Sequence, residues 1–490
     1  MDIAGRAKAL VRDQLGAKWA ERRPRRPDPV LSDHGLGSDD RGLLLHGRPL
    51  GDLADEYGSP LHVIDGARLD ARLADVAAGP ADVYYSYKTN PIPAALERMH
   101  RAGLGAEVIS AYELWMAHEL GVPADRTIYN GPVKSAESVR GAIQRGILLI
   151  NANSASEIDV IEAIAADEGR SATVGVRIAL PGMWAGQFGI RSWSDEALGA
   201  IRTALDADHL DLKALHFHRG VTMRTRAEYE AYVNDVLAYC DAVTEATGWS
   251  PEMLDLGGSL ACATVGAIPA IDFRANRAYG TDLLPPSTDD FVSVRAAGES
   301  ATRMLEQHFG SRGLTVPRAI LEPGRALTAD TQLLVTTVHD VKADGEPWHV
   351  IADAGINIAE AVSNEYHGLL HAGDPLGPAD RSYRIAGPIC TPADVLYNNW
   401  RLPEVRTGDR LAILDTGAYC VPFSTTFSFP RPAIVVVDPD GVTVAQDRET
   451  FDDMIRRDHF VPLEATNPSA PGAEATGSDE HAATPVDAAS

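Results

Sequence analysis

The chain is poor in cysteine, which limits both disulfide and metal chemistry. Its 490 residues include four cysteines, Cys240, Cys262, Cys390 and Cys420. They form no CxxC pair and no His/Cys cluster at the spacing of a zinc site. Disulfide frameworks are typical of short secreted chains, so a low cysteine content in a chain of this length favours a reducing compartment.

Positive charge and long hydrophobic runs are also scarce. The 44 Lys and Arg residues are outnumbered by 69 Asp and Glu residues, and the formal net charge is -25. A chain of this charge repels phosphate backbones and anionic lipid, which excludes nucleic acid and membrane surfaces as general partners. No stretch approaches the length of a membrane span, and the N-terminal sequence lacks the apolar core that directs secretion. We therefore expect a cytoplasmic protein.

The composition is that of a globular protein with flanking segments. Hydrophobic residues make up 45% and charged residues 23%, and the length predicts two or three domains. Residues 1–50 are predicted to comprise a helix to about residue 20, a linker "RRPRRPDP", and a strand "GLLLHGRPL" that joins a later β domain. Residues 464–490 are rich in Ala, Pro, Ser, Gly and acidic residues, which cannot bury a core, so we expect disorder there.

Between residues 51 and 325, short apolar runs alternate with amphipathic helical stretches. The runs are "LHVID", "DVYYSYK", "AEVIS", "TIYNG", "ILLINAN", "TVGVRIAL", "ALHFH", "MLDLGG" and "RAILEPGR". Strands separated by helices of this length predict βαβ units and a parallel sheet. Eight or nine units over roughly 250 residues are typical of an α/β fold of the (β/α)8 TIM-barrel type, with a doubly wound sheet as the alternative.

From residue 326 to residue 463 the pattern changes to strands with turn residues between them. The apolar stretches are "TQLLVTTVHDVKADGEPWHVIADAG", "RSYRIAGPIC", "RLAILDTGAY" and "PAIVVVDPDGVTVAQD". Helical patterns nearly vanish. We therefore expect a second, mostly β, barrel-like domain.

Polar residues collect where the predicted barrel strands end, which is where a TIM barrel carries its chemistry. The residues in question are Lys88 after "YYSY", His216 and His218 in "ALHFHRG", Gly257 and Gly258 after "MLDL", and Glu322, Gly324 and Arg325 after "AIL". A single polar residue at a strand end is usually a cap or a turn. Four sets in one barrel favour a common site.

Each of these residues also has a purely structural interpretation. Lys88 could extend from the barrel rim, His218 could be a core histidine, and "GGS" could be a tight turn. Glu322 and Arg325 could form an ion pair at the rim.

Together they favour one cofactor. A partly desolvated lysine is expected to have a lowered pKa and can form an imine with an aldehyde. A glycine turn offers N–H groups to a phosphate, and a carboxylate can hold a pyridinium proton. Aldehyde, phosphate and pyridine are the parts of pyridoxal phosphate.

The sequence resembles the fold-type III pyridoxal-phosphate-dependent decarboxylases, the family of ornithine, arginine and diaminopimelate decarboxylases. The resemblance spans about residues 51–462 and rests on the ordered series "YKTN", "HFHRG", "DLGGS", "LEPGR", "GPICTPAD" and "GAY". A glycine pair alone is weak, but "EPGR" after a lysine motif, with "GPIC" and "GAY" later, is specific.

The resemblance implies a role for each matching residue. Lys88 would form the internal aldimine, His218 would stack on the cofactor ring, and Glu322 would hold the pyridine nitrogen. The phosphate would be bound by the turn around Gly257, Gly258 and Ser259, by Gly324 and Arg325, and by Tyr419. Cys390 would return a proton to Cα, and the substrate-binding candidates are Asp353, Thr391 and Asp394. In this family Cys390 and Asp394 would enter from a second subunit, so we expect a homodimer with shared active sites.

The chain departs from the family pattern on the substrate side. Family members that act on dibasic substrates commonly have an acidic residue where this chain has Thr391, and diaminopimelate decarboxylases have an arginine about where it has Ala361. Glu360, Asn364, Glu365 and His367 are other polar residues nearby. The third glycine of the phosphate turn is Ser259, Val221 replaces a common serine, and "SKFG" appears as "GQFG" at residues 186–189.

We therefore expect a decarboxylase that removes the α-carboxylate of an amino acid, or of an intermediate derived from one, in a specialised biosynthetic pathway. Diaminopimelate decarboxylation in lysine biosynthesis is the alternative. An amino-acid racemase and a non-catalytic homologue are further alternatives. Retention of Lys88, Glu322 and Cys390 counts against the non-catalytic homologue.

Overall fold

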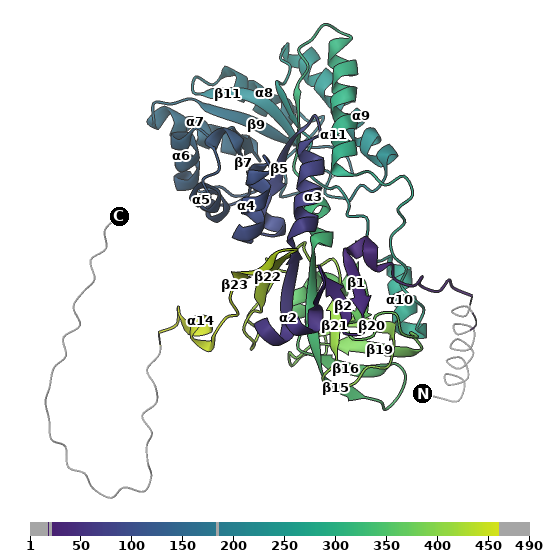
Figure 1. The fold of residues 1–490 in the computed structure, drawn as a ribbon. Coiled ribbons are helices and arrows are strands. Elements are labelled where there is room, and N and C mark those ends of the chain that lie inside the picture. The colour runs from purple at the N-terminus through teal and green to yellow at the C-terminus, as the bar shows by residue number, and fades with distance from the viewer. Residues whose placement is uncertain (1–17, 19–21, 183–185, 460–490) are drawn as a thin grey trace, which may run out of the picture.

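The computed structural model describes residues 18, 22–182 and 186–459, which form two domains (Figure 1). The expected N-terminal helix, apart from residue 18, and the expected disordered tail at 464–490 lie outside the described residues. No helix in the described part of the chain is long and apolar enough to cross a membrane.

The first domain is a closed barrel of eight parallel strands, as the sequence predicts. Strand β14 pairs with β5 and β8 pairs with β9, so the sheet closes on itself and the doubly wound alternative is excluded. A short strand, β10 (Ile190–Arg191), is added beside β9. The barrel strands are β5 (Asp82–Ser86), β6 (Gly105–Val108), β7 (Thr127–Tyr129), β8 (Leu149–Ala152), β9 (Ala172–Ala179), β11 (Leu210–Phe217), β12 (Met253–Asp255) and β14 (Arg318–Leu321).

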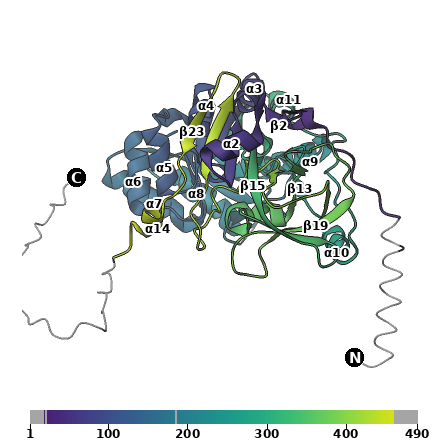
Figure 2. The ribbon, with the colours of Figure 1, turned by 60° about the horizontal axis from the view of Figure 1, so that its bottom comes forward.

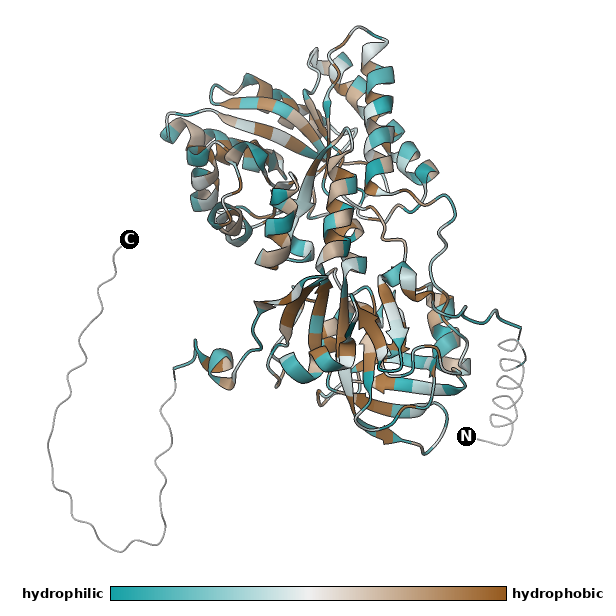
Figure 3. Cartoon of the chain, in the orientation of Figure 1, coloured by the Kyte–Doolittle hydropathy of each residue, from teal (hydrophilic) through white to brown (hydrophobic). Residues whose placement is uncertain are grey.

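Helices surround the barrel, and their N-termini are fixed by capping side chains. Ser110, Ser154 and Ser293 each accept a backbone N–H three residues later, which stops the preceding loop and starts the helix. The strands are largely hydrophobic and the helices carry their polar residues on the outside (Figure 3). The helices are α3 (Gly66–Ala77), α4 (Pro93–Arg101), α5 (Ala111–Glu119), α6 (Ala136–Arg145), α7 (Ala155–Asp167), α8 (Asp195–Asp206), α9 (Arg226–Thr247) and α11 (Val294–Leu305).

The second domain is built on a mostly antiparallel sheet. Its strands are β15 (Gln332–Lys342), β16 (Trp348–Ala352), β18 (Leu369–His371), β19 (Arg381–Ala386), β20 (Val395–Leu402), β21 (Arg410–Ile413), β22 (Ala433–Asp438) and β23 (Gly441–Gln446). Short helices α12 (Arg325–Thr328), α13 (Ile356–Ala359) and α14 (Phe451–Ile455) accompany them.

One strand expected in the barrel belongs to this second sheet. β4 (Leu61–Asp65), the run "LHVID", pairs with β15 and β22. Its five residues are all buried, and a strand covered on both faces has the same apolar pattern in either domain. The run near residue 45 is not part of that sheet: β1 (Leu36–Asp39), β2 (Gly42–Leu45) and β3 (Arg48–Pro49) form a separate sheet that, with α2 (Leu50–Tyr57), packs on the β domain.

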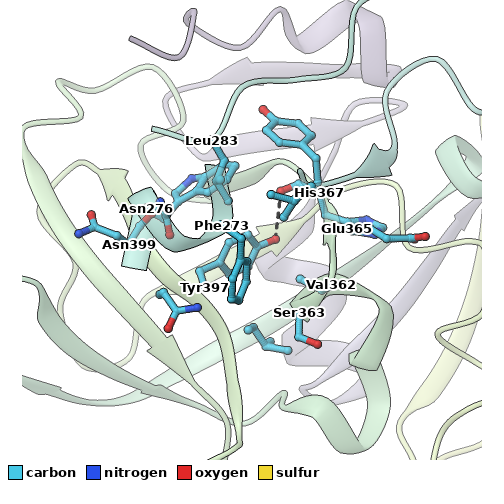
Figure 4. Close-up of a pocket in the computed structure, with 14 residues that line it drawn as sticks. Phe273, Asn276, Leu283, Val362, Ser363, Glu365, His367, Tyr397 and Asn399 are labelled. Carbon is cyan, nitrogen blue, oxygen red and sulfur yellow. Dashed lines mark hydrogen bonds and ion pairs between the residues drawn. The ribbon is translucent and has the colours of Figure 1, made fainter. Parts of the chain in front are cut away.

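A long segment between β12 and α11 leaves the barrel and lies against the β domain. In Figures 1 and 2 its helix α10 (Ala270–Tyr279) sits beside the strands of the lower domain. Its strand β13 (Gly266–Ala267) pairs with β17 (Glu365–Tyr366). The pocket in Figure 4 lies at this contact, where the Asn276 side chain donates to the Asn399 carbonyl at 2.8 Å. These bonds fix the β domain next to the barrel's carboxyl end.

Candidate active site

Lys88 lies in a single 3-10 turn, Tyr87–Thr89, directly after β5. Its Nζ donates to Glu107 Oε2 at 2.9 Å, and Glu107 on the neighbouring strand β6 is fully buried. Burial pushes the pKa of Lys88 down, but the carboxylates of Glu107 and Glu322 outweigh it, so the pKa is raised. The expectation of a lowered pKa is therefore wrong, because sequence inspection did not find the buried carboxylate of Glu107.

Glu322 follows β14 and is buried, with 3% of its surface exposed. Its Oε1 accepts a hydrogen bond from Asn130 Nδ2 at 2.6 Å, and its Oε2 lies 3.6 Å from His216 Nε2. Burial alone would raise the pKa of Glu322, yet His216, a hydrogen bond with Asp255 and the charge of Lys88 hold it below its ordinary value. Glu322 is therefore ionised.

Asp255, at the end of β12, is the neutral partner of Glu322. It is fully buried, and burial together with the charge of Glu322 raises its pKa well above the usual range. Its oxygens accept the Gly257 N–H at 3.0 Å and the Asn151 side-chain amide at 3.1 Å. A protonated Asp255 beside an ionised Glu322 satisfies both carboxyl groups with one shared proton.

The glycine turn and His218 lie against each other. Gly257 has φ +63°, and a Cβ on Gly258 would lie 2.4 Å from the carbonyl oxygen of Glu322. Ser259, the departure from the family's third glycine, adopts the left-handed φ of +62°. Its Oγ accepts the Gly220 N–H at 2.9 Å and lies 3.2 Å from His218 Nε2. The Ser259 side chain thus links the glycine turn to the loop that carries His218, a contact that a glycine at this position could not make.

His218 is held neutral. Burial, followed by the charges of Lys88 and Arg177, lowers the pKa of His218 to about 3. Its Nδ1 accepts the Gly258 N–H at 3.3 Å. A neutral imidazole can stack on an electron-poor ring without adding a positive charge to it.

Gly324, Arg325 and Tyr419 complete the group of barrel-mouth candidates. A Cβ on Gly324 would collide with the Thr89 side chain, so the chain passes close to the lysine turn. The Tyr419 N–H donates to the Thr89 carbonyl at 2.9 Å. Arg325 forms an ion pair with Glu365 at 2.6 Å and lies over the Tyr419 ring at 5.1 Å. The rim ion pair between Glu322 and Arg325 does not form, because Glu365 takes the guanidinium.

The remaining candidates lie in the β domain, and their described hydrogen bonds stay within it. Asp353 accepts bonds from Thr336 and Thr337, and Cys390 is exposed in the β19–β20 connection beside Thr391.

Asp394, a substrate-binding candidate, is already hydrogen-bonded within its own chain. It is 2% exposed, and its two oxygens accept the N–H groups of Ile356 and Ile389 at 2.8 and 2.9 Å. It therefore holds two loops together.

Sequence inspection missed five polar residues on the barrel strands beneath the candidate site. They share a signal: each is a single polar residue within, or directly after, an apolar barrel strand. They are Glu107 in "AEVIS", Asn130 in "TIYNG", Asn151 in "ILLINAN", Arg177 in "TVGVRIAL" and Asp255 in "MLDLGG".

The residues present fit pyridoxal phosphate. Both ring nitrogens of His216 are buried without a hydrogen-bond partner, next to the ionised Glu322. The site therefore contains polar atoms that a bound group could hydrogen-bond. His216, His218 and Glu322 also offer ligand atoms within 4.8 Å of one another, as a metal site would. The cofactor accounts for more of the site, because it also uses Lys88 and the glycine turn. Lys88 would bond to its aldehyde, Glu322 would hold its ring nitrogen, and the turns at Gly257 and Gly324 would face its phosphate.

Comparison with known proteins supports the same family. Residues 67–329 match the family model described as "Pyridoxal-dependent decarboxylase, pyridoxal binding domain". The diaminopimelate decarboxylase of Methanothermobacter thermautotrophicus is 30% identical over 454 residues, covering 88% of this chain and 97% of that protein. The crystal structure of diaminopimelate decarboxylase from M. jannaschii has a TM-score of 0.77 and 25% identity, covering 88% of this chain and 99% of that one.

A further structural relative was solved with the cofactor. A mutant of SrLDC in complex with PLP has a TM-score of 0.64 and 25% identity, covering 79% of this chain and 93% of that chain. The family model covers more than half of the chain, and the relatives align over nearly their whole length. The chain belongs to the pyridoxal-phosphate-dependent decarboxylases and is a carboxy-lyase acting on an amino acid.

Proposed function

We propose that this chain decarboxylates diaminopimelate, the alternative that the sequence left open. The observation that carries the proposal is the 30% identity to a diaminopimelate decarboxylase over 97% of that protein's length. Relatives from Aquifex aeolicus and Corynebacterium efficiens, at 27% and 28% identity, carry the same name.

The residues of the barrel mouth are suited to loss of CO2 from Cα. When bound, pyridoxal phosphate supplies an electron sink for the carbanion that decarboxylation leaves. Ionised Glu322 would keep a proton on the ring nitrogen, and neutral His218 would lie against the ring without adding charge. The turns around Gly258 and Gly324, where the backbone has no room for a Cβ, would hold the phosphate and so orient the bound substrate.

A second candidate is a specialised decarboxylase with a different substrate. It is favoured by Ala361 and Thr391, which place no charge where the resemblance leads us to expect an arginine and an acidic residue. Glu365, which could supply a negative charge nearby, is already paired with Arg325.

We also propose a homodimer in which each barrel is completed by the β19–β20 loop of the other chain. Cys390 is exposed on that loop, and the described hydrogen bonds of its neighbour Thr391 stay within the loop. An exposed thiol is available to a second subunit, where it can protonate Cα.

The test is CO2 release by purified, cofactor-loaded protein. Meso-diaminopimelate should release CO2 and yield lysine, whereas lysine, ornithine and arginine should release little. Release from another amino acid, with none from diaminopimelate, would establish the second candidate. In that case Ala361→Arg should create measurable turnover of diaminopimelate. Release from no amino acid would reject both candidates.

A further inference from the structure

Glu107 makes three hydrogen bonds at the floor of the barrel mouth. Its Oε2 accepts from Lys88 Nζ at 2.9 Å and also from the Ser86 hydroxyl. Its Oε1 accepts from Asn130 Nδ2 at 3.0 Å. The carboxylate has no exposed surface, so no water competes for the Lys88 proton at this atom.

Asn130 joins this carboxylate to the one that serves the cofactor ring. Its Nδ2 donates to Glu107 Oε1 and, at 2.6 Å, to Glu322 Oε1. Its own oxygen accepts from Asn151 Nδ2 at 2.8 Å, and Asn151 also donates to Asp255. One amide therefore fixes the spacing of the two carboxylates, and a second amide orients it.

The charges that face this pair come from several elements. Glu322, Tyr419 and Glu107 raise the pKa of Lys88 against the effect of burial. The other titratable groups around the pair are Glu113 on α5, Arg177 on β9, His216 and His218 at the end of β11, and Asp255 on β12.

We infer that Glu107 is the catalytic proton acceptor for Lys88 when this lysine bonds to the cofactor aldehyde. The proton moves from Nζ to Oε2 of Glu107, and the freed lone pair attacks the aldehyde carbon. The aldehyde oxygen leaves as water after taking up two protons: one from the attacking nitrogen and the one stored on Glu107. When the substrate amine displaces Lys88, the released lysine is neutral and Glu107 is again its nearest partner.

The contact supplies a direct path for the transfer, and the ion pair is its resting state. The carboxylates of Glu107 and Glu322 raise the pKa of Lys88, so the charged pair is favoured before the cofactor bonds. The fully buried carboxylate of Glu107 receives the proton at the contact itself. The donors Ser86 and Asn130 hold the Glu107 carboxylate in place, with its Oε2 at 2.9 Å from Lys88 Nζ.

The experiment measures how fast the cofactor-free protein forms its visible absorption band on mixing with pyridoxal phosphate, between pH 6 and pH 9. The native rate should vary little with pH, because the proton passes inside the pair. Glu107→Gln should be slower by about a hundredfold at pH 7, as for loss of a general base. At pH values below the pKa of Lys88 in this variant, its rate should then rise about tenfold per pH unit. A flat or faster profile for Glu107→Gln would overturn the inference.

A second readout is the pKa of Lys88 in the cofactor-free protein, from the pH dependence of amine labelling. Glu107→Gln should lower this pKa, whereas an unchanged value would contradict a direct pair. Glu113→Gln is the matched control, because Glu113 is a buried carboxyl nearby that accepts the Ile109 N–H and no described hydrogen bond from Lys88. If Glu107→Gln does not fold, Glu107→Asp is the substitute, because the shorter side chain moves the carboxylate away from Lys88 Nζ. It should slow the bonding of Lys88 to the cofactor by about tenfold. An equal rate would also overturn the inference.

These measurements involve no amino-acid substrate. The inference rests on the cofactor and not on diaminopimelate, so either can fail without the other.

Discussion

At the scale of single residues, the site works by fixing protonation states in a confined space. Asp255 and Glu322 are adjacent carboxyl groups with opposite assignments, one neutral and one ionised. The difference arises from neighbours: Glu322 faces His216 and Lys88, whereas Asp255 accepts from neutral amide groups. Burial amplifies such differences because unpaired charge is costly there.

Lys88 is expected to be the lysine that carries the cofactor. Borohydride treatment of the yellow protein should bleach its absorption and fix the cofactor to the peptide containing Lys88. Lys134 is a stringent control near the same barrel end, because its fully buried Nζ is already bonded to Gly131, Asn151 and Glu157. Attachment of the cofactor to any other lysine would contradict the assignment of Lys88. The other lysines are Lys8, Lys18, Lys134, Lys213 and Lys342.

Replacing Glu322 by glutamine should cost most of the activity. Glu322→Gln keeps the size and the bond to Asn130 but removes the charge that holds the ring proton. We expect decarboxylation to fall at least about a hundredfold, or about 3 kcal/mol in barrier, with a smaller change in cofactor affinity.

Asp255→Asn is the control, because asparagine resembles the neutral acid already present. Its loss should be clearly smaller than that of Glu322→Gln. Near-normal turnover by Glu322→Gln would show that the ring nitrogen is not held this way.

At the scale of helices and strands, the features that could be predicted are those that depend on local sequence patterns. The barrel strands could be predicted because apolar runs end in polar residues at regular spacing, and the lysine, glycine-turn and "EPGR" positions followed from those ends. β4 was assigned to the wrong domain because the sequence of a fully buried strand does not indicate which sheet it joins. The hydrogen bonds of Asp394 and Glu107 could not be predicted, because each joins different structural elements.

Helix α5 gives a pH-dependent contribution to stability. Glu113, in its first turn, accepts the Ile109 N–H, and burial followed by the charge of Glu107 raises its pKa to about 7. The folded state thus holds a proton that the unfolded chain loses above its ordinary pKa. This stability is fully present below about pH 4.5 and is lost as the pH rises through 7.

The measurement is the free energy of unfolding from pH 4.5 to pH 8. Glu113 should contribute a decline of about 3 kcal/mol over that range. Glu113→Gln should remove that part of the decline, because glutamine cannot titrate. An unchanged pH dependence in this variant would show that Glu113 ionises normally in the folded protein.

At the scale of the whole molecule, three separate segments bind the two domains together. β4 crosses from the barrel side into the second sheet, and β13 pairs with β17. The arm before β1 adds a third contact. The Arg26 guanidinium lies 3.6 Å over the Trp400 ring and donates to the Arg401 carbonyl, while its N–H donates to Asp282. Because β4 and the segment between β12 and α11 both join the barrel chain to the β domain, the barrel mouth and the β domain are expected to move as one body.

The shared-site dimer can be tested by mixing two inactive variants. Lys88→Ala and Cys390→Ala each remove one residue, and these residues lie in different domains. Each variant alone should be nearly inactive. After subunit exchange, half of the dimers are mixed, and each mixed dimer has one site with both residues intact. Activity should therefore return to about a quarter of the native value. If both residues of a site came from one chain, no mixed dimer would hold an intact site. Continued inactivity in a mixture proven to have exchanged, for example by mass-tagged subunits, would reject the shared site and leave the cofactor chemistry of Lys88 untouched.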